Sequence, residues 1–218
     1  MKRFLKNNGL SLVLLAVFSC VLLGQFFVGH HHYNNEQREH GQPTVTYLEY
    51  VSGNHFLEAT MENWESEFFQ MFFFIILTVF LYQRGSAESK DPDEEEEVDR
   101  EPKSRKGAPW PVRKGGWTLR IYEHSLSLAF LLLFLASFYL HAVGGAGEYN
   151  DDQRAHGRLE RVTTLGYMST SRFWFESLQN WQSEFLAVGS MVVLSIFLRE
   201  KGSKESKPVD SPHQETGG

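Results

Sequence analysis

The chain contains a single cysteine, Cys20, among its 218 residues, so no disulfide can form within it. It also lacks a P-loop, a GxSxG motif, a dinucleotide-binding fingerprint, a CxxC pair and an HExxH motif. Basic residues are interleaved with acidic ones, which argues against nucleic-acid binding. We therefore expect no nucleic-acid partner and no cofactor. Enzymatic activity stays open, with a non-enzymatic role favoured.

Four long apolar segments are present instead, and they occupy residues 10–28, 64–82, 125–143 and 181–198. The first and third are close to the roughly 20 residues that cross a bilayer. The second and fourth reach that length only when they begin at Trp64 and Trp181, which would then lie at the membrane interface. The sequence therefore predicts an all-α membrane protein with four transmembrane helices and the lipid bilayer as its partner.

The two halves of the chain repeat one another. The motif NWxSEF at residues 63–68 returns 117 residues later at 180–185. The motif QRxHG at residues 37–41 returns 116 residues later at 153–157. Each copy contains two of the apolar segments, so both copies would have the same orientation in the membrane. This pattern predicts two tandem two-helix repeats in parallel orientation, an arrangement known from transporter folds.

Charge gives the orientation and the domain boundaries. Sixteen of the 21 lysines and arginines lie before the first apolar segment, between the second and third, or after the fourth. The positive-inside rule then places both termini in the cytoplasm. We expect the first apolar segment to be an uncleaved anchor, because it aligns with the third. The predicted parts are the first repeat at residues 1–84, a disordered charged cytoplasmic linker at 85–116, the second repeat at 117–201 and a disordered tail at 202–218.

The repeated polar residues are the candidate ligands for a solute or ion, on the outer side between the two spans of each repeat. Helical cap segments, residues 56–64 and 173–181, are expected there. Polar residues four apart share a helix face, and a carboxylate near a span faces a partner, water or the bundle interior. The candidate ion-binding residues are Glu67 and Glu184, Asn63 and Asn180, the counter-ions Arg38 and Arg154, and the histidines His40 and His156.

Binding of a divalent metal ion by the histidines is an alternative, although the spacing between them is not diagnostic of a metal site. The triplet His30-His31-His32 occurs only in the first half. His141 aligns with Gln25 and is expected to face the bundle centre. Gly24 and Gly189 are candidates for close approach between helices.

The motifs FLEATMENWESEF (residues 56–68) and FWFESLQNWQSEFL (residues 173–186) resemble those of a bacterial family of small four-span membrane proteins of unknown function. The resemblance implies a bacterial inner-membrane protein and supplies no catalytic residue. The two copies differ at one point, because Glu58 and Glu176 do not align without a gap.

Three functions are compatible with these residues. The first is binding or passage of a small solute or cation, favoured by the excess of acidic residues in the outer segments. The second is a structural or envelope-stress accessory, with a homo-oligomer left open. The third is a metal-dependent membrane enzyme, which predicts His40, His156 and an acid around one point.

Overall fold

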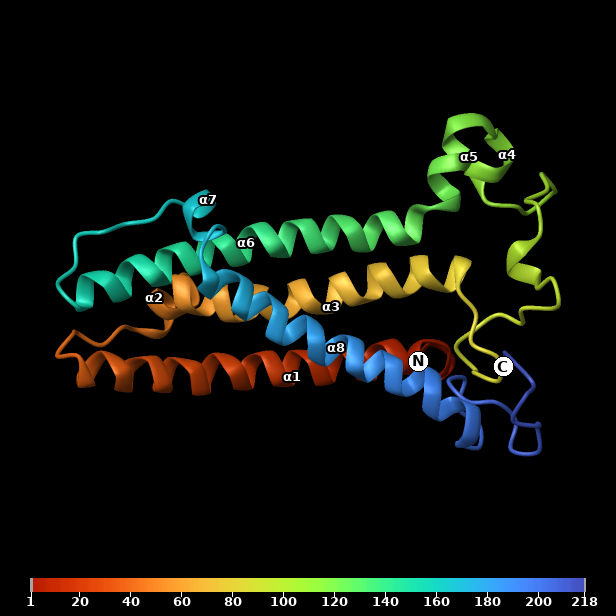
Figure 1. The fold of residues 1–218 in the computed structure, drawn as a ribbon, viewed down its shortest axis with the longest axis horizontal. Helices are drawn as coiled ribbons and strands as arrows, with labels where there is room; N and C mark the ends of the chain where they lie inside the picture. The colour runs from red at the N-terminus through yellow and green to blue at the C-terminus, as the bar shows by residue number, and fades with distance from the viewer. Residues whose placement is uncertain (1, 218) are drawn as a thin grey trace. The chain divides into compact units, whose positions relative to one another are not determined.

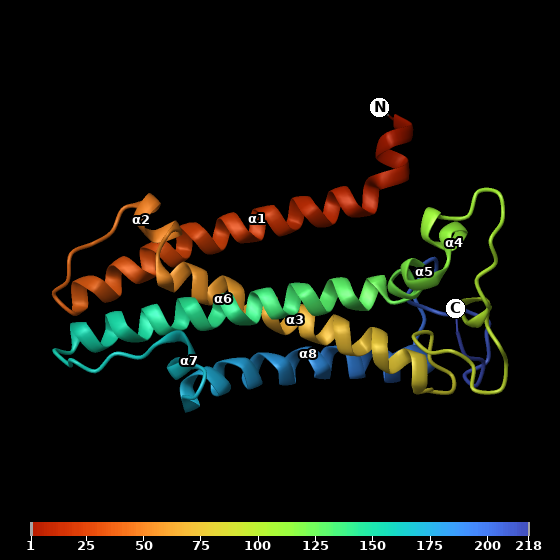
Figure 2. The same cartoon turned by 90° about the horizontal axis from the view of Figure 1, so that it is seen from above.

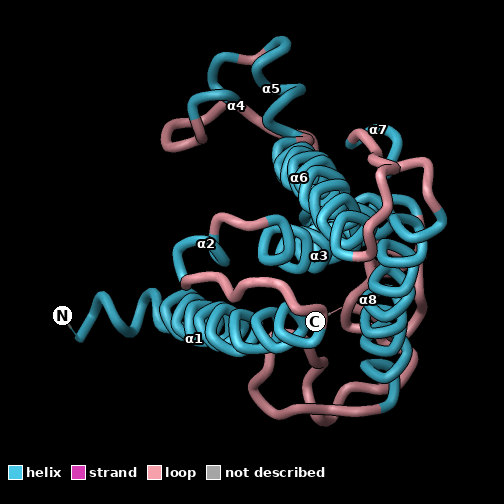
Figure 3. Tube along the Cα trace, turned by 90° about the vertical axis from the view of Figure 1, so that its left-hand side faces the viewer, coloured by secondary structure: helices cyan, strands magenta, loops and turns pink. Residues whose placement is uncertain are grey.

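The computed structural model describes residues 2–217 of the chain, which are helical and contain no β-strand (Figure 3). Four long helices contain the four apolar segments, apart from the last residues of the second and fourth: α1 (Lys2–Glu39), α3 (Asn54–Phe80), α6 (Ser125–Ala155) and α8 (Ser171–Phe197) (Figure 1). The all-α fold class is confirmed. Each long helix also continues past its apolar segment at the end that was predicted to lie outside the membrane.

Two of these helices, α1 and α6, are long and apolar enough to cross a membrane by length and composition. The helix α1 lies near the N-terminus, where a signal sequence would pass the same test. The helices α3 and α8 fall short of it. In α3 the acids Glu62 and Glu65 and the amide of Gln70 lower the hydropathy of the N-terminal half.

The described chain divides into two compact units. The first consists of residues 2–61 and 139–173, and the second of residues 62–138 and 174–217. Three long helices, α3, α6 and α8, begin in one unit and end in the other.

Two short helices lie in the first unit. They are α2 (Tyr47–Val51) and α7 (Thr164–Tyr167). Each begins after a threonine whose hydroxyl accepts a backbone N–H, Thr46 from Glu49 and Thr163 from Gly166. The helix α2 lies beside α1 (Figures 1 and 2), where the ring of Tyr47 is 4.0 Å from that of His30 between centroids.

An asparagine near the C-terminal end of α1 and another near that of α6 each bind the backbone of the loop that follows the helix. The Asn34 side chain accepts the N–H of Val45 at 2.7 Å and donates to its carbonyl at 3.0 Å. Asn150 makes the same two bonds to Val162, at 2.8 and 2.9 Å. The Asn34 and Asn150 amides therefore fix how each loop returns toward the next helix.

The second unit contains an equivalent pair of turns, at the ends of α3 and α8. Ser89 accepts the backbone N–H of Gln83 at 2.8 Å, and Ser206 accepts that of Glu200 at 2.9 Å. Gly85, which begins the first of these turns, has a φ of 85° that favours glycine.

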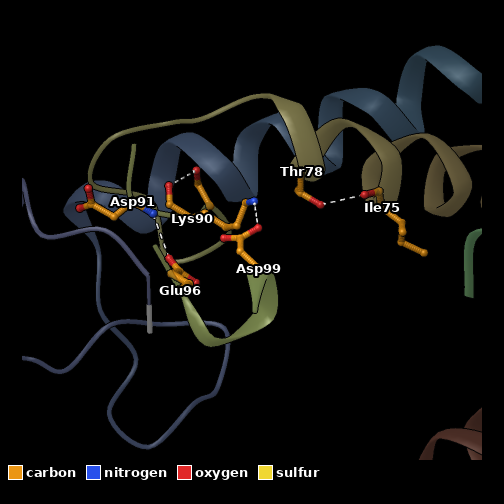
Figure 4. Close-up of polar contacts among 7 residues, drawn as sticks. Ile75, Thr78, Lys90, Asp91, Glu96 and Asp99 are labelled. Atoms are coloured by element: carbon orange, nitrogen blue, oxygen red, sulfur yellow. Dashed lines mark hydrogen bonds and ion pairs between the residues drawn. The ribbon is translucent and has the colours of Figure 1, made fainter. Parts of the chain in front are cut away.

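The segment predicted as a disordered linker contains the 3₁₀ helix η1 (Glu97–Asp99) and the short helix α4 (Trp110–Lys114), and α5 (Gly116–Glu123) follows it. Lys90 Nζ lies 2.6 Å from Asp99 Oδ1, and the Asp91 N–H donates to Glu96 (Figure 4). The tail also makes hydrogen bonds. Disorder of residues 85–116 and 202–218 stays a prediction.

The glycines expected to bring helices together do not do so. A Cβ added at Gly24 or Gly189 would meet nothing within 4 Å. The close approaches lie instead at the run Gly144-Gly145-Ala146-Gly147 of α6. There, added Cβ atoms would collide with Glu58, Tyr167 and Asn54.

Candidate functional site

A cavity of about 520 Å³ lies in the first unit, between residues of the C-terminal ends of α1 and α6 and the loop after α1. Its lining carries more acidic than basic side chains. The charged lining residues are Glu36, Glu148, Asp151 and Asp152, with Arg154 and Arg172. Arg154 is already bound, because its guanidinium lies 3.1 Å from Asp151 on the same helix. The cavity is therefore suited to a cation.

Glu148 is the distinctive carboxylate of this cavity. Burial raises its pKa from the ordinary 4.5 to about 7, and the negative charges of Glu58 and Asp151 add to the shift, against the opposing charge of Arg172. Glu148 forms no salt bridge within residues 2–217. At neutral pH its carboxyl group therefore exchanges readily between the protonated and charged forms.

Glu58 on α3 has a different environment. Its side chain is nearly buried, at 9% exposure, and lies 3.5 Å from the guanidinium of Arg172. The hydroxyl of Tyr167 donates to it at 3.3 Å. This carboxylate is therefore neutralised by an ion pair and a hydrogen bond, as a buried charge requires.

His141 lies next to Glu58 and is fully buried. A ring nitrogen of His141 and a carboxylate oxygen of Glu58 lie within 4.8 Å of each other, a spacing found between ligands of one metal ion. The positive charge of Arg172, 3.5 Å from the Glu58 carboxylate, opposes a second cation there.

A smaller cavity of about 170 Å³ shares Tyr33 and Asp151 with the acidic cavity. Asn54 donates to Asp151 at 3.0 Å. In the lining of the same small cavity, the Tyr50 hydroxyl and His55 Nδ1 are 3.2 Å apart. Burial lowers the pKa of His55 and raises that of Tyr50 to about 12, so both groups are neutral at neutral pH.

The structure brings His40 and His156 together. Their ring centroids are 5.5 Å apart. The two repeated arginines have partners on their own helices: Arg38 donates to Asn35 at 3.0 Å, and Arg154 pairs with Asp151. The expectation that they are counter-ions of Glu67 and Glu184 finds no support in these bonds.

The remaining predicted residues belong to the second unit. Glu67 and Glu184 are close enough for their charges to interact. Asn180 donates to Glu62, whereas Asn63 is exposed to solvent. The fully buried acid of this part of α3 is Glu65, which accepts the indole N–H of Trp181 at 3.0 Å. Residues two apart on a helix point in nearly opposite directions, so burying Glu65 exposes Asn63 and Glu67.

Glu148, Glu58, Arg172 and Glu65 are not among the candidate ligands that the sequence predicts. Their importance depends on which helices meet. One signal was available, because four small residues in succession at 144–147 mark a place where another backbone comes close. Glu148 follows that run directly.

Comparison with known proteins gives a family and nothing more specific. No curated protein and no solved structure matches the chain. A family model described as "Domain of unknown function (DUF6766)" matches residues 1–218, which include both long-helix pairs, the linker and the tail. The chain therefore belongs to the DUF6766 family.

Proposed function

We propose that the chain is a four-span protein of the bacterial inner membrane with both termini in the cytoplasm. The exposed surface of α1 supports membrane insertion. Along this helix apolar side chains are exposed one after another, for example Leu10 at 78% and Val28 at 71%. So large an apolar surface is unfavourable in water and suits lipid.

The helices α3 and α8 are the less apolar spans of this proposal. The C-terminal half of each is apolar, and their polar residues gather in the N-terminal half. Several of these polar groups are bonded within the protein, as in the pair formed by Trp181 and Glu65. A bonded polar group costs much less at membrane depth than an isolated one.

Equivalent contacts in the two halves support two tandem repeats in parallel orientation. Asn34 and Asn150 close their loops by the same two bonds. Tyr50 and Tyr167 are both buried, and each packs on a glycine of the preceding long helix. Such agreement of details is expected from duplication of one two-helix unit.

Topology is tested by single cysteines in a Cys20→Ser background. Ser104→Cys in the linker and Glu160→Cys in the second outer loop would be labelled with a membrane-impermeant maleimide in intact cells. We expect labelling at residue 160, and at residue 104 only after permeabilisation. If only α1 and α6 crossed the membrane, the linker and the second loop would exchange sides, which would overturn the four-span proposal.

The proposed function is the binding of a small cation in the acidic cavity, as a step toward its passage or sensing. The observation that carries this proposal is Glu148, a half-buried carboxylate that has no salt bridge to any of residues 2–217, in a cavity where acids outnumber arginines. Such a group gains free energy either from a proton or from a cation that replaces it. Proton and cation would therefore compete for this site.

The test is thermal unfolding of the purified protein in detergent at pH 8, with sodium, calcium or tetramethylammonium chloride at matched ionic strength. We expect one of these cations to raise the unfolding midpoint of the wild type, and Glu148→Gln to abolish that rise. Glu39→Gln is the matched control, because Glu39 is exposed and does not line the cavity. Equal rises in all three proteins would mean that Glu148 is not the binding group.

The second candidate is a structural accessory without ligand, and the Glu58 network favours it. The contacts of Glu58 with Arg172 and Tyr167 form a closed polar cluster of the kind that fixes helix packing. A lack of any cation effect at every pH, together with a large stability loss in Glu58→Gln, would support this alternative.

A further inference from the structure

We propose that His40 and His156 bind one divalent transition-metal ion, of the zinc class, at the rim of the acidic cavity. The two rings lie 5.5 Å apart between centroids and are inclined at 61°. Two imidazoles on one zinc, each with a Zn–N distance of about 2.0–2.1 Å, have ring centres about 5 Å apart. The rings are thus already near the separation that a shared metal requires.

The His156 ring is oriented for coordination. Its Nδ1 lies 2.9 Å from the backbone carbonyl of Asp152 and 3.2 Å from the carboxylate of the same residue. An Nδ1–H donated to a carbonyl leaves the lone pair on Nε2, which is the usual arrangement of a metal-binding histidine. Asp152 therefore acts as a positioning residue for the proposed ligand.

The same acid–histidine spacing occurs at the end of α1. Glu36 precedes His40 by four residues, as Asp152 precedes His156, and the two pairs are related by the 116-residue offset of the repeats. Glu36, His40 and Asp152 all line the acidic cavity. Two imidazoles form a donor set suited to zinc, cobalt or nickel rather than magnesium. The Asp152 carboxylate lies beside the His156 ring, whereas that of Glu36 lies 3.4 Å from His32.

Backbone geometry supports the pairing. His40 is followed by Gly41 with a φ of 68°, and His156 by Gly157 with a φ of 70°. Each helix therefore ends with the same left-handed glycine turn directly after its histidine. A metal on both rings would connect the two helix ends and so restrain the cavity between them.

This site goes beyond the proposed function, because its two ligands do not include Glu148. Both histidines are exposed, at the ends of their helices, so a metal can enter from solvent and complete its coordination with water. The neighbouring carboxylates of Glu36 and Asp152 raise the local concentration of cations.

The experiment is calorimetric titration of the untagged, metal-free full-length protein in detergent with zinc chloride at pH 7.5, repeated with cobalt chloride and visible absorption. We expect one zinc per chain in the wild type, and cobalt bands of a nitrogen-containing site. His40→Ala and His156→Ala should each weaken zinc binding by about tenfold or more, and Asp152→Asn by a factor of about ten.

Two controls make the result decisive. His31→Ala removes an exposed histidine outside the site and should leave zinc affinity unchanged. Glu148→Gln should keep zinc binding even if it abolishes the cation effect at Glu148, so the two proposals can fail separately. Unchanged affinity in both His40→Ala and His156→Ala, or a stoichiometry that follows the total histidine count, would overturn the metal site.

Discussion

A methyl group on Gly144 of α6 would lie 2.6 Å from the backbone nitrogen of Glu58 on α3 and 2.9 Å from its Cα. The two helix backbones are therefore in direct contact at this point. The contact also sets the depth at which the Glu58 carboxylate is held. The polar cluster of the first unit thus depends on a residue that has no side chain.

Gly144→Ala is expected to destabilise the protein by about 1–3 kcal/mol, because the colliding atoms belong to backbone and cannot move away cheaply. Gly189→Ala is the matched control, since its Cβ would meet nothing and alanine favours a helix by about 1 kcal/mol. Thermal unfolding in detergent measures both. A neutral Gly144→Ala would mean that α3 and α6 are not in contact there.

Asn34→Ala and Asn150→Ala should lower the free energy of unfolding by similar amounts, about 1–3 kcal/mol each. Each change leaves a backbone N–H and a carbonyl of the following loop without the bonds that the amide supplies. Asn35→Ala, which removes only a bond to exposed Arg38, serves as the control. Very unequal effects at Asn34 and Asn150 would argue against equivalent repeats.

Glu148 predicts a pH dependence of stability. Its pKa is raised from 4.5 to about 7 in the folded state, so the folded state binds this proton more tightly than the unfolded state. The stabilisation that this bound proton gives to the folded state is fully present below pH 4.5, decreases as the pH rises toward 7, and is absent above pH 7.

Glu148→Gln should remove this loss of stability with rising pH. At pH 8 the variant should be more stable than the wild type by about 1–3 kcal/mol and should unfold at a higher temperature. At pH 4.5 the two proteins should be alike. Unfolding midpoints measured from pH 4.5 to 8 test this, with Glu39→Gln as the exposed control. Parallel pH profiles for wild type and Glu148→Gln would contradict the assignment.

Arg172 and Glu58 should be energetically coupled. Arg172→Met removes the ion pair of Glu58 and keeps the hydrogen bond that Tyr167 donates to it. The change should lower the free energy of unfolding by about 1–3 kcal/mol, a modest loss because the arginine side chain is 40% exposed. In Glu58→Gln the same arginine change should cost much less. A double-mutant cycle of unfolding free energies gives the coupling, and additive effects would exclude an energetic pair.

Lys207 should hold the tail against the second unit. Its amine donates to the carbonyls of Pro212, His213 and Glu215, at 3.2, 3.1 and 2.7 Å, and the residue is 1% exposed. Lys207→Met is expected to raise hydrogen–deuterium exchange of residues 208–217, because the replacement cannot make these bonds. Lys204→Met, at an exposed position, should not. Fast exchange of the tail already in the wild type would favour the predicted disorder.

The helical elements could be predicted from the sequence because their signals are local. Apolar runs, charge bias and the repeated motifs placed all four long helices. The short helices α2 and α7 were missed, since four or five residues give too little periodicity and their threonine caps were not recognised.

The sequence by itself determined that the chain is helical and that the motifs NWxSEF and QRxHG each occur twice, which gives His40 and His156 matching positions. Tertiary structure alone decided that these histidines meet, that Glu65 rather than Glu67 is buried, and that Glu148 lines a cavity with Glu36 and Asp152. Helix formation depends on neighbours along the chain. The burial and pKa of a polar side chain depend instead on which helix faces approach each other, and here the small residues of α6 decide that approach.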